Sequence, residues 1–113
     1  AGAWLGGEKG VLLMQSSGVG NTINAIALPQ ATRMPLFTIV TMRGEWGEGN
    51  PWQVPMGQAT ATVLEAMGVK VFRIDHPHEV GEVVGAAAQL AFNTNQSVAV
   101  LLSQRLIGAK EFK

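Results

Sequence analysis

Short apolar runs alternate with helix-like segments along the chain, and this alternation constrains the fold more than any other feature. Four runs have the length and composition of β-strands: 11–16, 36–42, 69–74 and 97–103. The segments between them have helical patterns: 21–31, 58–67 and 77 to about 92. Such an alternation predicts a three-layer αβα fold, in which helices cover both faces of a mainly parallel sheet. The continuous apolar run 11–16 predicts a strand that is buried on both faces.

Length and composition limit the class of protein. With 113 residues, of which 47% are hydrophobic, the chain is expected to form one domain with a substantial core. The formal net charge is zero and only 14% of residues are charged, which argues against a nucleic-acid-binding surface and indicates that a partner covers part of the exterior. The absence of cysteine excludes disulfides, thiolate catalysis and cysteine-ligated zinc. No apolar run approaches the roughly 18 residues of a membrane-spanning helix, so we expect a cytoplasmic protein without a membrane anchor.

The chain begins AGAWLGGEKG, without an initiator methionine. These residues have the pattern of the last turns of a helix that ends at Gly6 or Gly7. We therefore expect 1–113 to be a single, N-terminally incomplete domain.

In a parallel α/β sheet, ligands bind beyond the carboxyl ends of the strands. Three segments of the predicted fold lie there: SSGVGN (16–21), RGEWGEGNPWQ (43–53) and DHPHE (75–79). The first has two glycines of a dinucleotide fingerprint, but Ile23 stands where the third glycine is needed. Arg43 stands where an acid would hold a ribose and would suit a 2′-phosphate instead, so an NADP site stays open. A second alternative also stays open, in which the two glycines serve only to allow the tight turn and bind no ligand.

The second segment belongs to a long Gly-, Pro- and Trp-containing loop over 43–57. Loops of this length in compact domains are usually functional or disordered. Arg43 follows a strand directly, and its guanidinium could grip an anion with paired hydrogen bonds. The alternative is that Arg43 pairs with Glu45 or Glu48 and only ties the loop down.

In the third segment, Asp75, His76 and His78 could chelate a metal, but no further cluster supplies the completing ligands. A helix that begins here, with Pro77 in its first turn, explains the same residues. We therefore predict that this chain provides no metal ligands.

Three stretches taken in order, LLMQSSGVGNTINAI, MPLFTIVTMRGEWGEGNPWQVPMGQAT and LLSQRLIG, resemble the pyrimidine-binding domain of thiamine-diphosphate-dependent 2-oxo acid decarboxylases. The resemblance covers essentially the whole chain, and its most specific parts are Gln-x-Ser-Gly-x-Gly-Asn and Arg-Gly-Glu. The branch it resembles most is the sulfopyruvate decarboxylase α subunit, with phosphonopyruvate decarboxylase next. It implies a thiamine-diphosphate-binding fold that here lacks its first strand.

The resemblance implies a site divided between two domains. One domain holds the aminopyrimidine of the cofactor, and a second holds the diphosphate and Mg²⁺ through a GDG…N motif, of which the GDG does not occur in this chain. Those ligands would come from a β subunit or a second domain, within a homo- and hetero-oligomer. The residues that would line the pyrimidine are Gly18, Gly20 and Asn21, and those that would bind the substrate are Arg43, Gln53 and Gln15.

The catalytic residue of this family is a Glu that activates the cofactor through its pyrimidine ring. The match places that Glu upstream of Ala1, so no catalytic residue is assigned here and the chain alone is expected to be inactive. The implied reaction is that of a carbon–carbon lyase, the decarboxylation of an anionic 2-oxo acid, in the first place sulfopyruvate to sulfoacetaldehyde and CO₂. Three alternatives stay open: a phosphonopyruvate decarboxylase, a non-catalytic binding module of the same fold, and an NADP-binding domain.

Overall fold

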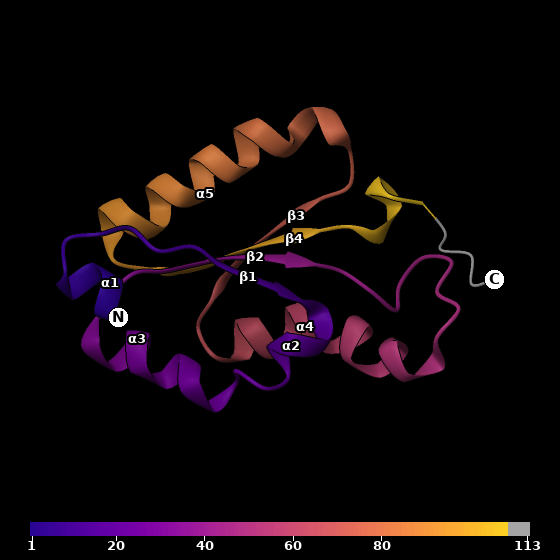
Figure 1. The fold of residues 1–113 in the computed structure, drawn as a ribbon, viewed down its shortest axis with the longest axis horizontal. Coiled ribbons are helices and arrows are strands. Elements are labelled where there is room, and N and C mark those ends of the chain that lie inside the picture. Colours follow the sequence, from indigo (N-terminus) through magenta and orange to yellow (C-terminus); the bar gives the residue numbers. More distant parts are fainter. Residues whose placement is uncertain (109–113) are drawn as a thin grey trace.

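A four-stranded, all-parallel sheet forms the centre of the molecule, and helices cover its two faces (Figure 1). The computed structural model describes residues 1–108. The strands follow the spatial order β1-β2-β4-β3, and their bounds are β1 Leu12–Gln15, β2 Leu36–Thr41, β3 Lys70–Ile74 and β4 Ser97–Leu102. The α-helices are α1 Gly2–Leu5, α2 Ser16–Val19, α3 Ala27–Thr32, α4 Val54–Ala66 and α5 Val80–Thr94. The single-turn 3₁₀ segments are η1 Asn24–Ile26, η2 Pro51–Gln53, η3 Pro77–Glu79 and η4 Gln104–Leu106.

Two apolar clusters, one on each face of the sheet, hold the three layers together. On one face, Val98 and Val100 pack with α5. On the other, Ala99 and Leu101 pack with α2, η1 and α4. The side chains of β4 alternate between the two clusters because successive residues of a strand point to opposite faces. The predicted three-layer α/β fold with a parallel sheet is therefore confirmed.

The prediction that 11–16 is buried on both faces is wrong. β1 lies at an edge of the sheet and pairs with β2, with Leu12 opposite Thr38. Leu12 is 43% exposed and Leu13 is 70% exposed. An apolar run shows that a strand favours burial, but its place in the order of strands decides how much of it is covered.

Two predicted boundaries differ from the structure. The helix expected over 21–31 is interrupted: α2 ends at Val19, and the chain passes through turns and η1 before α3 begins at Ala27. The loop expected over 43–57 is shorter, because α4 begins at Val54 with Pro55 in its first turn. Proline fits the first turn of a helix, since the amide hydrogen that it lacks would have no intrahelical partner there.

Within residues 1–108, no helix combines the length and the apolar content that crossing a bilayer requires.

Candidate functional site

The glycine-containing turn after β1 and the loop after β2 meet at the carboxyl edge of the sheet. Ser16 Oγ accepts a hydrogen bond from the backbone amide of Arg43 at 3.0 Å. A methyl group at Gly20 would lie 3.0 Å from Met56 Sδ, so the turn also packs against the start of α4. The structure thus brings together two of the three predicted ligand-binding segments.

Two amide groups at the end of the turn are used within the turn itself. The amide of Asn21 donates to the carbonyl of Gly18 at 3.0 Å, and that of Thr22 donates to the carbonyl of Val19 at 2.9 Å. Because α2 has only four residues, it offers no helix N-terminus of the kind that holds a dinucleotide phosphate. The short α2 therefore argues against an NADP site at this turn.

The two glycines of the turn are not required by backbone conformation, since neither Gly18 nor Gly20 has a positive φ. At Gly20, the requirement is space, because of the contact with Met56. The interpretation that these glycines only let the turn close does not account for that contact.

Arg43 forms a part-buried ion pair with Glu48. Its Nε donates to Glu48 Oε1 at 2.7 Å and its Nη2 donates to Glu48 Oε2 at 2.5 Å. The side chain of Arg43 is 12% exposed and that of Glu48 is 3% exposed. The expected pairing of Arg43 with an acid of its own loop is thus confirmed for Glu48. Among residues 1–108, no hydrogen bond engages Nη1 of Arg43, which is the atom left to meet a ligand.

The carboxylate of Glu48 accepts several of the hydrogen bonds that hold the loop together. Besides Arg43, it accepts hydrogen bonds from the amides of Gly44 and Asn50 and from the side chain of Gln104. Hydrogen bonds from Arg43, and smaller contributions from the backbone amides of Gly44 and Asn50, outweigh the opposing effect of burial and together lower the pKa of Glu48 to about 2. Glu48 is therefore ionised throughout the physiological range.

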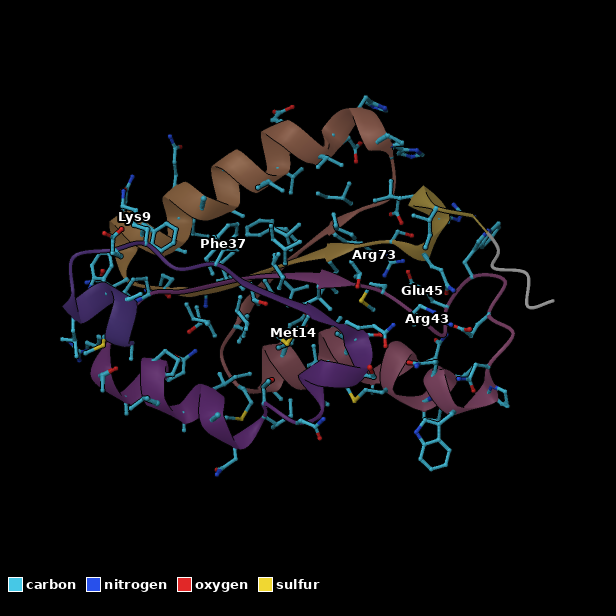
Figure 2. The ribbon with its side chains drawn as sticks, in the orientation of Figure 1. Lys9, Met14, Phe37, Arg43, Glu45 and Arg73 are labelled. Carbon is cyan, nitrogen blue, oxygen red and sulfur yellow. The ribbon has the colours of Figure 1, made fainter. Side chains whose placement is uncertain are left out.

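A second group of hydrogen bonds joins the loop to η4. Gln104, which is 1% exposed, accepts hydrogen bonds from the amides of Glu45 and Trp46 at 3.1 and 3.0 Å. The carboxylate of Glu45 accepts from the amide of Gln104 at 2.9 Å and from Arg73 Nη2 at 2.8 Å. Figure 2 shows Arg43, Glu45 and Arg73 gathered at the carboxyl edge of the sheet. Glu45 thus pairs with Arg73 rather than with Arg43.

The start of α4 lies directly on the backbone at Arg43 and Gly44. A methyl group at Gly57 would approach the carbonyl oxygen of Arg43 to 1.9 Å, so only glycine fits there. Gly44 has a φ of +73°, and Gln58 Nε2 donates to its carbonyl at 2.9 Å. This close approach fixes the position of the backbone from which the side chain of Arg43 extends.

The other predicted site residues lie around the same edge. Gln53, in η2, has a buried Oε1 without a hydrogen-bond partner among residues 1–108. The Oε1 of Gln15 accepts from Ser17 Oγ at 2.6 Å, on the exposed side of the turn. Asn21 is exposed. A buried acceptor without a donor is unusual in a folded protein, so Gln53 Oε1 marks a place where a ligand or a water molecule donates.

The third segment is linked to this arrangement through Arg73, which donates hydrogen bonds to both Glu45 and Asp75. The rings of His76 and His78 stack at 5.7 Å, and Asp75 accepts from Arg73 Nε at 3.2 Å. Pro77 begins η3, which confirms the predicted start of a helical segment. No group of three or more potential metal ligands occurs in the part of the chain that the structure describes. That the chain provides no metal ligands stays a prediction.

Glu48 and Gln104 organise the loop in roles that the sequence does not predict. The sequence indicates Glu48 only as a possible partner of Arg43, and it does not single out Gln104. A signal is present in LLSQRL, where a polar residue closely follows a buried strand at the edge that carries the site. A buried amide at that position is well placed to bind the backbone of a neighbouring loop.

A separate hollow of about 310 Å³ lies at the opposite, amino-terminal edge of the sheet, lined by residues that include Trp4, Phe37 and Phe92. None of the loops after the strands reaches it. It is therefore not part of the candidate site.

Comparison with known proteins gives the chain its relatives. It is 41% identical to the sulfopyruvate decarboxylase subunit alpha of Methanococcus maripaludis over 102 aligned residues. These residues make up 89% of this chain and 61% of that protein. It is 38% identical over 103 residues to the protein of the same name from Methanothermobacter thermautotrophicus, with 90% and 62% covered. It is 42% identical over 67 residues to the phosphonopyruvate decarboxylase of Streptomyces viridochromogenes, with 58% and 17% covered. No protein-family model matches the chain.

The chain spans about three-fifths of the length of the curated α subunits that it matches. The matches reproduce the order of likeness indicated by the motifs, with sulfopyruvate decarboxylase α subunits over nine-tenths of the chain and phosphonopyruvate decarboxylase over a shorter stretch. This chain is homologous to the α subunits of sulfopyruvate decarboxylase.

Proposed function

We propose that residues 1–113 supply the pyrimidine-binding part of a thiamine-diphosphate-dependent decarboxylase that acts on a small anionic 2-oxo acid. The observation that carries this proposal is the similarity to sulfopyruvate decarboxylase α subunits over nine-tenths of the chain. Sulfopyruvate is the first candidate substrate, because the similarity to phosphonopyruvate decarboxylase covers only 58% of the chain.

The residues present fit one end of the cofactor. An aminopyrimidine has flat apolar faces and an exocyclic amine that donates hydrogen bonds. The side chain of Met56 packs against Gly20 and offers an apolar surface beside the turn, and the buried Gln53 Oε1 is an acceptor that lacks a donor among the described residues. Gly18 and Asn21 would complete the lining. When bound, the thiazolium of thiamine diphosphate provides the electron sink that decarboxylation of a 2-oxo acid requires.

The diphosphate and Mg²⁺ are assigned to a partner subunit. Two amides of the turn after β1 are used within the turn, and the described residues hold no cluster of metal ligands. The word alpha in the names of the relatives implies another subunit in those enzymes. We infer that such a subunit or domain faces the carboxyl edge of this sheet.

Arg43 is proposed to bind the distal sulfonate of the substrate. Glu48 neutralises its charge, so the sulfonate would meet a positioned donor, Nη1, rather than an isolated cation. The part-buried pair keeps that donor in place at the end of β2. The proposed role is orientation of the substrate, which contributes to the rate by holding the reacting groups in register.

The function is tested with the complete protein, its partner subunit, thiamine diphosphate and Mg²⁺. Release of CO₂ from sulfopyruvate only in the complete mixture is the expected result, with phosphonopyruvate as the competing substrate. A mixture in which the subunits associate and bind thiamine diphosphate, but release no CO₂ from either acid, would overturn the proposal.

The role of Arg43 needs a variant that leaves no unpaired buried charge. Arg43→Met combined with Glu48→Met removes both members of the pair and keeps the volume apolar. We expect this double variant to raise the KM for sulfopyruvate by about tenfold or more while the affinity for thiamine diphosphate stays the same. An unchanged KM would remove Arg43 from the substrate site.

A further inference from the structure

The start of α4 carries an exposed apolar surface that the fold does not use. Pro51, Trp52, Pro55 and Met56 line an open hollow of about 470 Å³ there, and we call these four residues the Trp52 platform. Trp52 is 87% exposed. An indole buries roughly 150–250 Å² when it is covered, so leaving it in water forfeits a large hydrophobic gain.

The platform is held rigidly. The side chain of Asn50 accepts a hydrogen bond from the amide of Trp52 at 3.0 Å, and the amide of Gln53 donates to the carbonyl of Asn50 at 3.1 Å. Pro51 and Pro55 fix φ on either side of the tryptophan. The backbone that carries Trp52 is therefore ordered before a partner binds, which lowers the entropic cost of forming an interface there.

The platform is continuous with the candidate cofactor site. Met56 belongs to both, since its sulfur lies against Gly20 of the turn after β1. A surface that covers the platform would therefore extend directly over the edge where the aminopyrimidine is proposed to bind.

The chemistry of the platform selects an apolar partner surface. Residues 49–64 contain no Asp, Glu, Lys or Arg, so the platform and the helix behind it offer no charge to an acidic or basic ligand. Large aromatic anchors without surrounding charge are typical of the centres of protein–protein interfaces.

We propose that the Trp52 platform is the docking surface for the partner subunit that carries the diphosphate-binding half of the cofactor site, with Trp52 as the anchor. This inference rests on the proposed function. The partner is specified by two features: the platform borders the proposed pyrimidine site, and the relatives are named as one subunit of a larger enzyme. It follows that the partner presents an apolar pocket beside its diphosphate motif.

The experiment measures the affinity between the full-length protein and its partner subunit from the same organism, by titration calorimetry, for the wild type and three variants. Trp52→Ala is expected to weaken the complex by about tenfold or more, and Trp52→Phe by much less. Leu28→Ala is the control, because Leu28 is also apolar and 55% exposed but lies on α3. It is expected to leave the affinity within about twofold.

The decarboxylation of sulfopyruvate is followed in the same mixtures, so that the two proposals can fail separately. Equal affinities for the wild type and Trp52→Ala, in a wild-type mixture that releases CO₂, would refute the docking surface and keep the proposed function. Dissociation of a homodimer by Trp52→Ala, with the partner affinity unchanged, would also refute it and make the platform a self-association surface. A wild-type mixture that neither associates nor releases CO₂ would refute the proposed function and the inference with it.

Discussion

Replacing Glu48 by Gln tests how far the loop after β2 depends on one carboxylate. The substitution keeps the shape of the side chain and one oxygen acceptor, but it removes the negative charge opposite Arg43. The guanidinium of Arg43, at 12% exposure, would then be left in the protein interior without its counter-ion.

The size of the effect follows from the titration of Glu48. Its pKa is lowered from 4.5 to about 2. Each tenfold change in a protonation equilibrium corresponds to about 1.4 kcal/mol, so the lowered pKa sets an upper limit of about 3 kcal/mol on the stabilisation by the ionised carboxylate at neutral pH, before screening by solvent. Breaking a buried ion pair from one side typically costs about 3–5 kcal/mol, and this limit lies at the lower end of that range.

Urea unfolding at pH 7 measures the loss as a change in the free energy of unfolding. We expect Glu48→Gln to lose up to about 3 kcal/mol, and the control Glu65→Gln, at an exposed position of α4, to stay within about 0.5 kcal/mol of the wild type. Adding Arg43→Met to Glu48→Gln is expected to recover part of the loss, since it removes the unpaired charge. A loss below about 1 kcal/mol for Glu48→Gln would refute the view that the pair organises the loop.

The same variant carries a pH dependence of defined sign. Because the pKa of Glu48 is lower in the folded state than in the unfolded state, its stabilisation is complete above about pH 4.5 and disappears as the pH falls toward about 2. The stabilities of the wild type and Glu48→Gln should therefore converge over this range. A constant difference between them down to pH 2 would contradict the assignment.

Further predictions concern two glycines and the hydrogen bonds made by Gln104. Gly57→Ala would place a methyl group 1.9 Å from the carbonyl oxygen of Arg43 and should destabilise the fold by about 3 kcal/mol or more. Gly85→Ala, in α5 with open space around it, should instead stabilise the fold by about 0.5–1 kcal/mol. Thermal unfolding of the two variants compares these effects. Gln104→Ala would leave the amides of Glu45 and Trp46 without their acceptor, at a cost of about 2–3 kcal/mol, and hydrogen exchange at these amides should accelerate. Unchanged exchange would show that the loop is held without Gln104.

The sequence by itself determined the class of fold and the edge of the sheet that carries the site. Apolar runs alternating with helical patterns fix a parallel three-layer arrangement, because both faces of such strands must be covered. Given that arrangement, the segments after the strands meet at one edge, so the ordered motifs around Gly18, Gly20 and Arg43 are placed there by the pattern of strands and helices alone. The relatives found by comparison agree with those motifs.

Tertiary structure alone decided the order of the strands and the partners of the charges. The position of β1 at the edge, with Leu13 exposed, depends on which strands pair, and a local pattern does not contain that information. Arg43 could have paired with either of two acids, and the assembled loop pairs it with Glu48. The contact between Gln104 and Trp46 joins residues 58 positions apart. Such contacts depend on where β2 and β4 end side by side, so they arise only when the sheet is assembled.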